Sequence, residues 1–299
     1  MTTPPSIPLA FAGDGAIRRV SVVGAGTMGS GIAQVLATAG LDVILIDTQA
    51  AQLDRAKITI EGSLARFVAK GTLTGEQCDA TAKRIRTAAA LDAAAEADIL
   101  IEAVAEDKQV KEAVFRGACA LLPEYAVLAS NTSSISITSL AAVVQHPQRV
   151  VGMHFFNPVP LMPLVEVVRG QLTSAETAAM VVALAEYLGK TPILVNDFPG
   201  FAANRILMPM LNEAFFALME GVAEREAIDQ VMKLGLNHPM GPLQLADLIG
   251  LDVCLHILEV LHRDLGDDKY RPCPLLRRMV AAGQLGRKSG AGFYDYSSD

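Results

Sequence analysis

The chain has 299 residues, of which 51% are hydrophobic and 19% charged, and its formal net charge is −7 at pH 7. This balance is typical of a soluble globular protein with enough core for two domains, and it excludes a disordered or fibrous chain. Because binding to phosphate backbones relies on clustered basic residues, and the sequence has no such cluster, no nucleic-acid partner is expected.

The cysteines and the N-terminal segment favour a cytoplasmic protein without a membrane segment. The four cysteines are widely separated and match neither a C-x-x-C pair nor a dense disulfide framework, so we expect reduced thiols and no metal site. Residues 1–16 contain no Lys or Arg, and Pro8 breaks their apolar stretch, which is unlike a secretory or transit signal. We expect a flexible tail there. No apolar run approaches the roughly 20 residues that span a bilayer.

Short runs rich in β-branched residues alternate with helical stretches from Ile17 onward, a pattern typical of a parallel, doubly wound sheet. Between the second and third runs, residues 49–90 keep a helical pattern broken at Gly71 and Gly75, which predicts a helical hairpin inserted in the domain. The predicted strands cover residues 18–23, 41–47, 98–104, 125–130, 149–156, 164–168 and 192–195, and a helix is predicted near residues 174–188.

Beyond Asp197 the apolar residues recur at helical spacing alone. The sequence therefore predicts a Rossmann-like α/β domain with a mostly parallel sheet over residues 17–197, followed by an all-α domain over residues 198–299. Residues 204–220 are apolar on more than one face, which is typical either of a dimer interface or of a helix buried in the core.

A glycine-rich loop follows the first predicted strand and opens a helix. Backbone N–H groups at such a helix start can face a pyrophosphate, while the glycines permit close approach. The second strand ends in Asp47, at the interval of about 20 residues where a carboxylate can accept both ribose hydroxyls. Asp47 would repel a 2′-phosphate, so NAD is favoured over NADP. If the glycines only packed helix against strand, Asp47 would be unexplained. The predicted loop is Gly24, Ala25, Gly26, Thr27, Met28 and Gly29.

His154 and Glu166 interrupt two apolar strand-like runs. If residues 158–163 form the bend between antiparallel strands, symmetric pairing about Pro160 places the two side chains opposite each other. A carboxylate beside an imidazole fixes the ring tautomer and stabilises its charged form, as a general acid/base requires. The alternative is a core histidine whose hydrogen bonds are satisfied.

Residues 128–136 are dense in hydroxyl and amide side chains and follow a predicted strand. Polar loops at the carboxyl ends of strands are where open α/β sheets bind ligands. Some of these residues are also expected to cap the helix that starts near Thr138.

These motifs and three others resemble the short-chain L-3-hydroxyacyl-CoA dehydrogenase family, in order from Ile17 to Tyr296. The resemblance implies NAD-dependent interconversion of a 3-hydroxyacyl-CoA and a 3-ketoacyl-CoA, with 3-hydroxybutyryl-CoA as the expected substrate. The matching segments are Gly-Ala-Gly-Thr-Met-Gly (24–29), Ser-Asn-Thr-Ser-Ser (130–134), Gly-Met-His-Phe-Phe-Asn-Pro (152–158), Leu-Val-Glu-Val-Val (164–168), Pro-Gly-Phe-Ala-Ala-Asn-Arg-Ile (199–206), Asn-His-Pro-Met-Gly-Pro-Leu (237–243) and residues 285–294.

The resemblance implies a role for each catalytic candidate. His154 matches the general base and Glu166 its carboxylate partner. Ser133 and Asn204 match groups that bind the substrate, where they can hydrogen-bond the reacting oxygen as charge develops. Asn157 matches a position near nicotinamide and substrate, although before Pro158 it can also be an ordinary turn residue.

The resemblance also implies contacts with the cofactor and with coenzyme A. Glu106, Lys111 and Lys288 match cofactor contacts, although the first two can be solvated charges at a helix start and the third a surface lysine. Ser63 and Lys70 lie seven residues apart on one helix, hence nearly on one face, and match positions that bind the coenzyme A part. A lysine at a helix end can also be merely solvated.

The family plan further implies a homodimer formed through the helical, substrate-binding domain. Two alternatives stay open: a related NAD-dependent dehydrogenase of a free hydroxy acid or sugar acid, like lambda-crystallin, and a binding or structural protein that keeps the fold without turnover. Ser63 with Lys70 favours a thioester substrate, and the complete set of His154, Glu166, Ser133 and Asn204 argues against loss of turnover.

Overall fold

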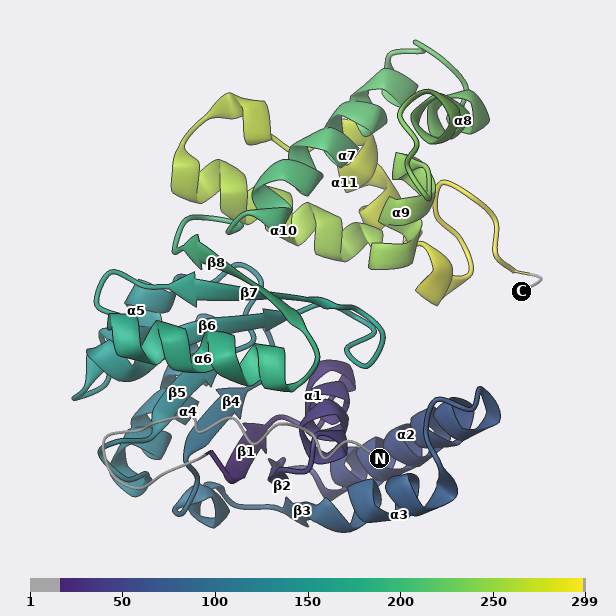
Figure 1. Cartoon of the computed structure of the whole chain (residues 1–299). Coiled ribbons are helices and arrows are strands. Elements are labelled where there is room, and N and C mark those ends of the chain that lie inside the picture. Colours follow the sequence, from purple (N-terminus) through teal and green to yellow (C-terminus); the bar gives the residue numbers. More distant parts are fainter. Residues whose placement is uncertain (1–16, 298–299) are drawn as a thin grey trace. The chain divides into compact units, whose positions relative to one another are not determined.

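The structure is a computed structural model that describes residues 17–297, so the tail expected at residues 1–16 lies outside the described part. The chain divides into two compact units at Asp197 and Phe198. Figure 1 shows the strands confined to the first unit and the helices α7 to α11 in the second.

The described residues of the first unit form an eight-stranded sheet in the order β3-β2-β1-β4-β5-β6-β7-β8. The strands from β3 to β6 in this order are parallel, β7 is antiparallel to β6, and β8 is parallel to β7. The predicted Rossmann-like, mostly parallel sheet is confirmed. The strands are β1 (Arg19–Val23), β2 (Asp42–Ile46), β3 (Ile85–Ala88), β4 (Ile99–Glu102), β5 (Val127–Ser130), β6 (Val150–Phe155), β7 (Leu164–Arg169) and β8 (Thr191–Asn196).

Helices cover both faces of this sheet, which explains why its central strands are continuously apolar. In β4, Ile99 and Ile101 belong to the apolar cluster that includes α1 and α6, whereas the fully buried Leu100 lies outside it. This alternation follows from the two-residue period of a strand. The helices of the unit are α1 (Thr27–Thr38), α2 (Ala50–Ala69), α3 (Gly75–Arg84), α4 (Lys108–Leu121), α5 (Ile137–Ala141) and α6 (Ala175–Tyr187).

The inserted hairpin consists of α2 and α3, as predicted, but the prediction of helix up to residue 90 was wrong. Gly71 adopts φ +69° after α2, and Thr74 begins α3 with a capping box to Gln77. Residues 85–88 then form β3, which pairs in parallel with β2. A four-residue edge strand depends on its neighbour for hydrogen bonds, and the surrounding alanines mask it in the sequence.

The second unit is all helical around its own apolar core, which includes Phe215, Leu243 and Leu258. Two buried carboxylates hold its segments together: Asp229 accepts the N–H groups of Leu243 and Gln244, and Asp247 accepts those of Phe293 and Tyr294. No helix within residues 17–297 is long and apolar enough to cross a membrane. The helices are α7 (Ala203–Met219), α8 (Arg225–Gly235), α9 (Pro242–Ile249), α10 (Leu251–Leu265) and α11 (Pro274–Ala281).

Candidate active site

The glycine loop lies between β1 and α1, and its glycines serve different purposes. A Cβ on Gly24 would come within 2.5 Å of the Ala103 carbonyl oxygen, and one on Gly29 within 1.7 Å of the Gly24 oxygen. These two glycines therefore allow the backbone to pack closely. A Cβ on Gly26 would meet nothing within 4 Å, and Gly26 caps α1 without a side-chain hydrogen bond. The start of α1 thus offers the backbone donors that a pyrophosphate needs.

Asp47 lies just after β2 and is tied to this loop. Its Oδ2 accepts the N–H of Ala25 at 2.8 Å, and its Oδ1 accepts the N–H of Gln49 at 2.9 Å. The half-buried carboxylate is thereby held beside the glycine loop, where a ribose would follow a bound pyrophosphate. The residues present fit a dinucleotide.

His154 and Glu166 are paired across the antiparallel strands β6 and β7, which confirms the predicted register. His154 Nδ1 lies 2.8 Å from Glu166 Oε2, and both side chains are buried. The ring of Phe156 lies against the imidazole, with centroids 4.6 Å apart. This geometry fixes which ring nitrogen faces the carboxylate and leaves Nε2 on the opposite edge of the ring.

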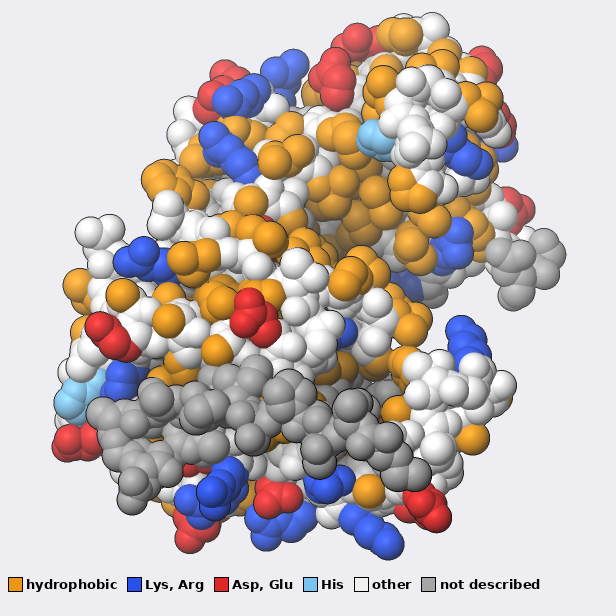
Figure 2. Space-filling model, viewed as in Figure 1, with side chains coloured by type: hydrophobic (Ala, Val, Ile, Leu, Met, Phe, Trp, Pro, Cys, Tyr) orange, Lys and Arg blue, Asp and Glu red, His pale blue; other side chains and the backbone are white. Residues whose placement is uncertain are grey.

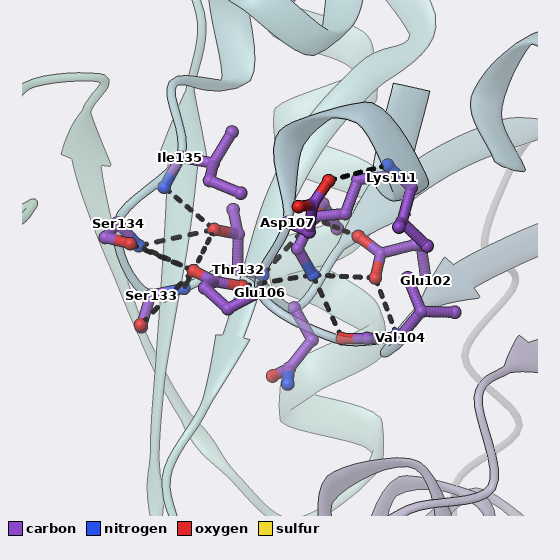
Figure 3. Close-up of polar contacts among 12 residues, drawn as sticks. Glu102, Val104, Glu106, Asp107, Lys111, Thr132, Ser133, Ser134 and Ile135 are labelled. Carbon is purple, nitrogen blue, oxygen red and sulfur yellow. Dashed lines mark hydrogen bonds and ion pairs between the residues drawn. The ribbon is translucent and has the colours of Figure 1, made fainter. Parts of the chain in front are cut away.

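Glu106 binds the turn that follows β5, as Figure 3 shows. Its Oε1 accepts the hydroxyl of Thr132 at 2.5 Å, the N–H of Ser133 at 2.9 Å and the N–H of Ser134 at 3.1 Å. The hydroxyl of Ser133 donates to the same oxygen at 3.3 Å. One carboxylate oxygen therefore orders the whole polar turn.

Lys111 is buried between two carboxylates. Its side chain is 1% exposed, and its Nζ lies 2.7 Å from Glu102 Oε1 and 3.1 Å from Glu106 Oε2. The possibility that Lys111 is a solvated helix-start charge is therefore wrong. Burial raises the pKa of Glu102 despite this ion pair. Burial also acts to raise the pKa of Glu106, but Lys111, Thr132 and Ser133 outweigh it and lower that pKa.

Sequence reasoning missed Glu102, and it named the polar segment 128–136 without giving Ser130 or Asn131 a role of its own. Glu102 ends an apolar strand, as Asp47 follows one, so its position was a usable signal. The hydroxyl of Ser130 donates to Glu102 Oε2 at 2.6 Å. Asn131 Oδ1 accepts the N–H of Phe155 at 2.9 Å and so links the ends of β5 and β6.

Several of the side chains described above lie along one edge of the sheet. The carboxyl ends of parallel strands meet at a common edge, and the glycine loop, Glu102, Ser130 and His154 lie at or next to the ends of β1, β4, β5 and β6. Such an edge can bind a dinucleotide and carry acid/base chemistry beside it. Among residues 17–297, no group of three or more His, Cys, Asp or Glu side chains could hold a metal ion.

The other predicted site residues lie in several places. Ser63 is buried in α2 whereas Lys70, at the end of the same helix, is exposed, and Asn157 is exposed directly after β6. In the second unit, Asn204 is buried in the first turn of α7. Lys288 pairs with Asp252, with Nζ 2.6 Å from Oδ1 and about half of its side chain exposed.

Two family models match nearly the whole described chain. Residues 19–198 match the NAD binding domain of 3-hydroxyacyl-CoA dehydrogenase, and residues 200–296 match its C-terminal domain. The chain belongs to the 3-hydroxyacyl-CoA dehydrogenase family. Members of this family are oxidoreductases that act on a CH–OH group, and the matched N-terminal domain identifies NAD as the cofactor.

Similar proteins extend the match over almost the entire length. A probable 3-hydroxybutyryl-CoA dehydrogenase of Bacillus subtilis is 56% identical, with 94% of this chain and 98% of that protein covered. One of Deinococcus radiodurans is 57% identical, with 93% and 100% covered. The crystal structure of (S)-3-hydroxybutyryl-CoA dehydrogenase from Ralstonia eutropha has a TM-score of 0.92 and 50% identity, with 95% and 100% covered.

Proposed function

We propose that the protein interconverts (S)-3-hydroxybutyryl-CoA and acetoacetyl-CoA with NAD. The buried contact of 2.8 Å between His154 and Glu166 supports this proposal, because a carboxylate beside the ring would orient His154 as an acid/base next to the dinucleotide loop. The substrate is inferred from the relatives at 56% and 57% identity and from the similar structure, all of which are named for 3-hydroxybutyryl-CoA.

His154 moves the proton of the reaction in this proposal. Bound NAD supplies the acceptor for the hydride that leaves C3 of the hydroxyacyl group. His154 takes the C3 hydroxyl proton in the oxidative direction and returns it to the keto oxygen in reverse. Glu166 orients the ring and stabilises the imidazolium that forms. Ser133 and Asn204 are the proposed hydrogen-bond donors to the reacting oxygen.

We further propose that residues 17–197 hold the cofactor through the glycine loop and the side chains beside it. The open position at Gly26 and the anchored carboxylate of Asp47 support this assignment. Both ribose hydroxyls can donate to Asp47, whereas a 2′-phosphate would be repelled, so NAD is preferred over NADP. Additional cofactor contacts are proposed for Glu106, Lys111, Asn157 and Lys288. Of these, Glu106 is 28% exposed, whereas Lys111 is buried and would act by holding Glu106 in place.

Ser63 and Lys70 are the proposed contacts of the coenzyme A part, and Asn157 is a further substrate contact. Coenzyme A is a large anion, and a chain of net charge −7 needs local cations to bind it. The exposed position of Lys70 at the end of α2 supports this role.

We also propose that residues 198–299 form a substrate-binding and dimerisation domain of a cytoplasmic homodimer. Large apolar side chains are exposed on and around α8, and Figure 2 shows hydrophobic side chains gathered on the surface of the helical unit. Val231 and Leu234 are 64% and 83% exposed in the single chain. Exposed apolar groups of this kind favour a protein partner, and a second copy fits the family plan. Sedimentation velocity tests the dimer.

Absorbance of NADH tests the reaction. Purified protein should oxidise NADH when acetoacetyl-CoA is added, and acetoacetate without the coenzyme should give far slower turnover. Turnover of the free acid but not of the thioester would transfer the proposal to the hydroxy-acid class.

A further inference from the structure

A closed ring of hydrogen bonds and ion pairs joins five residues at the ends of β4 and β5. Glu102 Oε2 accepts the hydroxyl of Ser130 at 2.6 Å, and that hydroxyl oxygen accepts the N–H of Thr132 at 3.2 Å. The hydroxyl of Thr132 donates to Glu106 Oε1 at 2.5 Å. Lys111 closes the ring, with Nζ 3.1 Å from Glu106 Oε2 and 2.7 Å from Glu102 Oε1.

Glu102 is the more deeply buried of the two carboxylates in this ring. Its side chain has no exposed surface, and Oε1 also accepts the N–H of Val104 at 2.7 Å. Two carboxylates thus share one ammonium group inside the protein, as Figure 3 shows. Removing one partner of a buried ion pair leaves the other charge less compensated, and Lys111 would then have Glu106 as its remaining carboxylate. The position of Lys111, and through it that of Glu106, therefore depends on Glu102.

The ring reaches both halves of the proposed site. Glu106 holds the turn that carries Ser133, as described above. The backbone that follows Glu102 also packs directly against the glycine loop. A Cβ on Gly24 would lie only 2.5 Å from the Ala103 oxygen. A displacement of the backbone at the end of β4 would therefore affect both the turn that carries Ser133 and the glycine loop.

We propose that Glu102 is a positioning residue for the dehydrogenase reaction, acting through Lys111 and Glu106 to hold Ser133 in its reactive place. This inference rests on the proposed substrate contact of Ser133. Glu102 needs no contact with substrate or cofactor for this role. Misplacement of a reacting group by about 1 Å can lower turnover by about a hundredfold. The effect of a positioning residue on kcat is therefore large enough to measure.

A double-mutant cycle in kcat tests the coupling. Glu102→Gln keeps the size of the side chain but removes its charge, and it should lower kcat by about 10- to 100-fold at unchanged folded fraction. In a Ser133→Ala background the same change should lower kcat by less than about twofold, because the group that it positions is already absent. Equal losses in both backgrounds would show that Glu102 acts independently of Ser133 and would overturn the proposal.

Hydrogen exchange gives a readout that needs no substrate. In Glu102→Gln the amides of Ser133 and Ser134 should exchange about tenfold faster, while those of β1 and β5 keep their protection. Faster amide exchange throughout the sheet would mean that Glu102 only stabilises the fold. Unchanged exchange in the turn would mean that Glu102 does not hold the turn, and either result would overturn the proposal. If the wild-type protein does not turn over acetoacetyl-CoA, the proposed reaction fails but this measurement still tests the ring.

Two further variants complete the design. Ser130→Ala opens the ring without changing any charge, so it should change kcat and turn exchange in the same direction by a smaller factor even if Glu102→Gln does not fold. Glu112→Gln is the matched control: this residue lies on α4 beside Lys111 and pairs with Arg116 at 3.0 Å, outside the ring. Glu112→Gln should leave kcat and the hydrogen exchange of the turn unchanged. An effect as large as that of Glu102→Gln would show that the ring has no special role and would contradict the proposal.

Discussion

Both units of the chain bury carboxylates, but they satisfy them with different partners. In the helical unit, Asp229 and Asp247 receive backbone N–H groups and tyrosine hydroxyls. In the α/β unit, Glu102 and Glu166 face side chains that can carry a positive charge, Lys111 and His154. The carboxylates of the helical unit join fixed points of the backbone. Those of the α/β unit lie beside charged or ionisable side chains, which can respond to a ligand bound nearby.

The difference separates structural carboxylates from those suited to chemistry. An N–H donor of the backbone keeps its proton at every relevant pH, so Asp229 can only hold α8 against the start of α9. An imidazole beside Glu166 can gain and lose a proton during a reaction. If this distinction is correct, changes in the two units should affect different measurements.

His154→Gln should produce the largest effect on activity. Glutamine keeps a polar side chain opposite Glu166 but cannot accept and return a proton, so kcat should fall by at least about a hundredfold, the usual scale for loss of a general acid/base. Turnover of NADH with acetoacetyl-CoA measures the loss, and circular dichroism checks the fold. If the variant is largely unfolded and the remaining folded molecules have normal activity, His154 is only a core residue.

Asp229→Asn should lower stability in the helical unit without changing the chemistry. Leu243 and Gln244 donate to different oxygens of Asp229, so the amide NH₂ of an asparagine would face one of these two donors and that hydrogen bond would be lost. Loss of a buried hydrogen bond to a charged group typically costs about 1.5 to 3 kcal/mol, which urea unfolding can measure. The kcat per folded molecule should stay within about twofold of the wild type. A large loss of kcat would contradict the division between the two kinds of carboxylate.

Asp47→Ala should reduce the preference for NAD over NADP. The substitution removes the acceptor for the ribose hydroxyls and the charge that repels a 2′-phosphate, so the ratio of the two kcat/KM values should fall by about tenfold. It also removes the acceptor of the Ala25 N–H, so the affinity for both cofactors should weaken. Unchanged selectivity would place the ribose contact elsewhere.

Glu106→Gln should lower kcat, because Glu106 holds the turn of Ser133, and its effect on stability should be small and visible in the pH dependence. The pKa of Glu106 is lowered in the folded protein, so its ionised form stabilises the fold at pH values above its unfolded pKa. That contribution is lost as the pH falls through the lowered folded pKa. The difference in unfolding free energy between wild type and variant should therefore be largest above about pH 4.5 and shrink below it. A constant difference would mean that the charge of Glu106 contributes nothing to stability.

Much of the fold was predictable because its signals are local. The alternation of short β-branched runs with helical stretches predicted the α/β sheet, the helical spacing after Asp197 predicted the all-α unit, and both are confirmed. Strand β3 was missed because four residues at a sheet edge have little pattern of their own. Its pairing with β2 comes from a segment about 40 residues earlier in the chain, which no local window contains.

The site divides in the same way. The glycine loop with Asp47 was predictable from local motifs, and so was the pairing of His154 with Glu166, since a short bend between two strands sets the register of residues 12 positions apart. The burial of Lys111 and the contact of Glu102 with Ser130, 28 residues away, were not predictable from local patterns. Those contacts depend on β4 and β5 lying side by side in the sheet. The order of strands is a property of the packed domain, because each strand gains its hydrogen bonds and buried surface only from its neighbours.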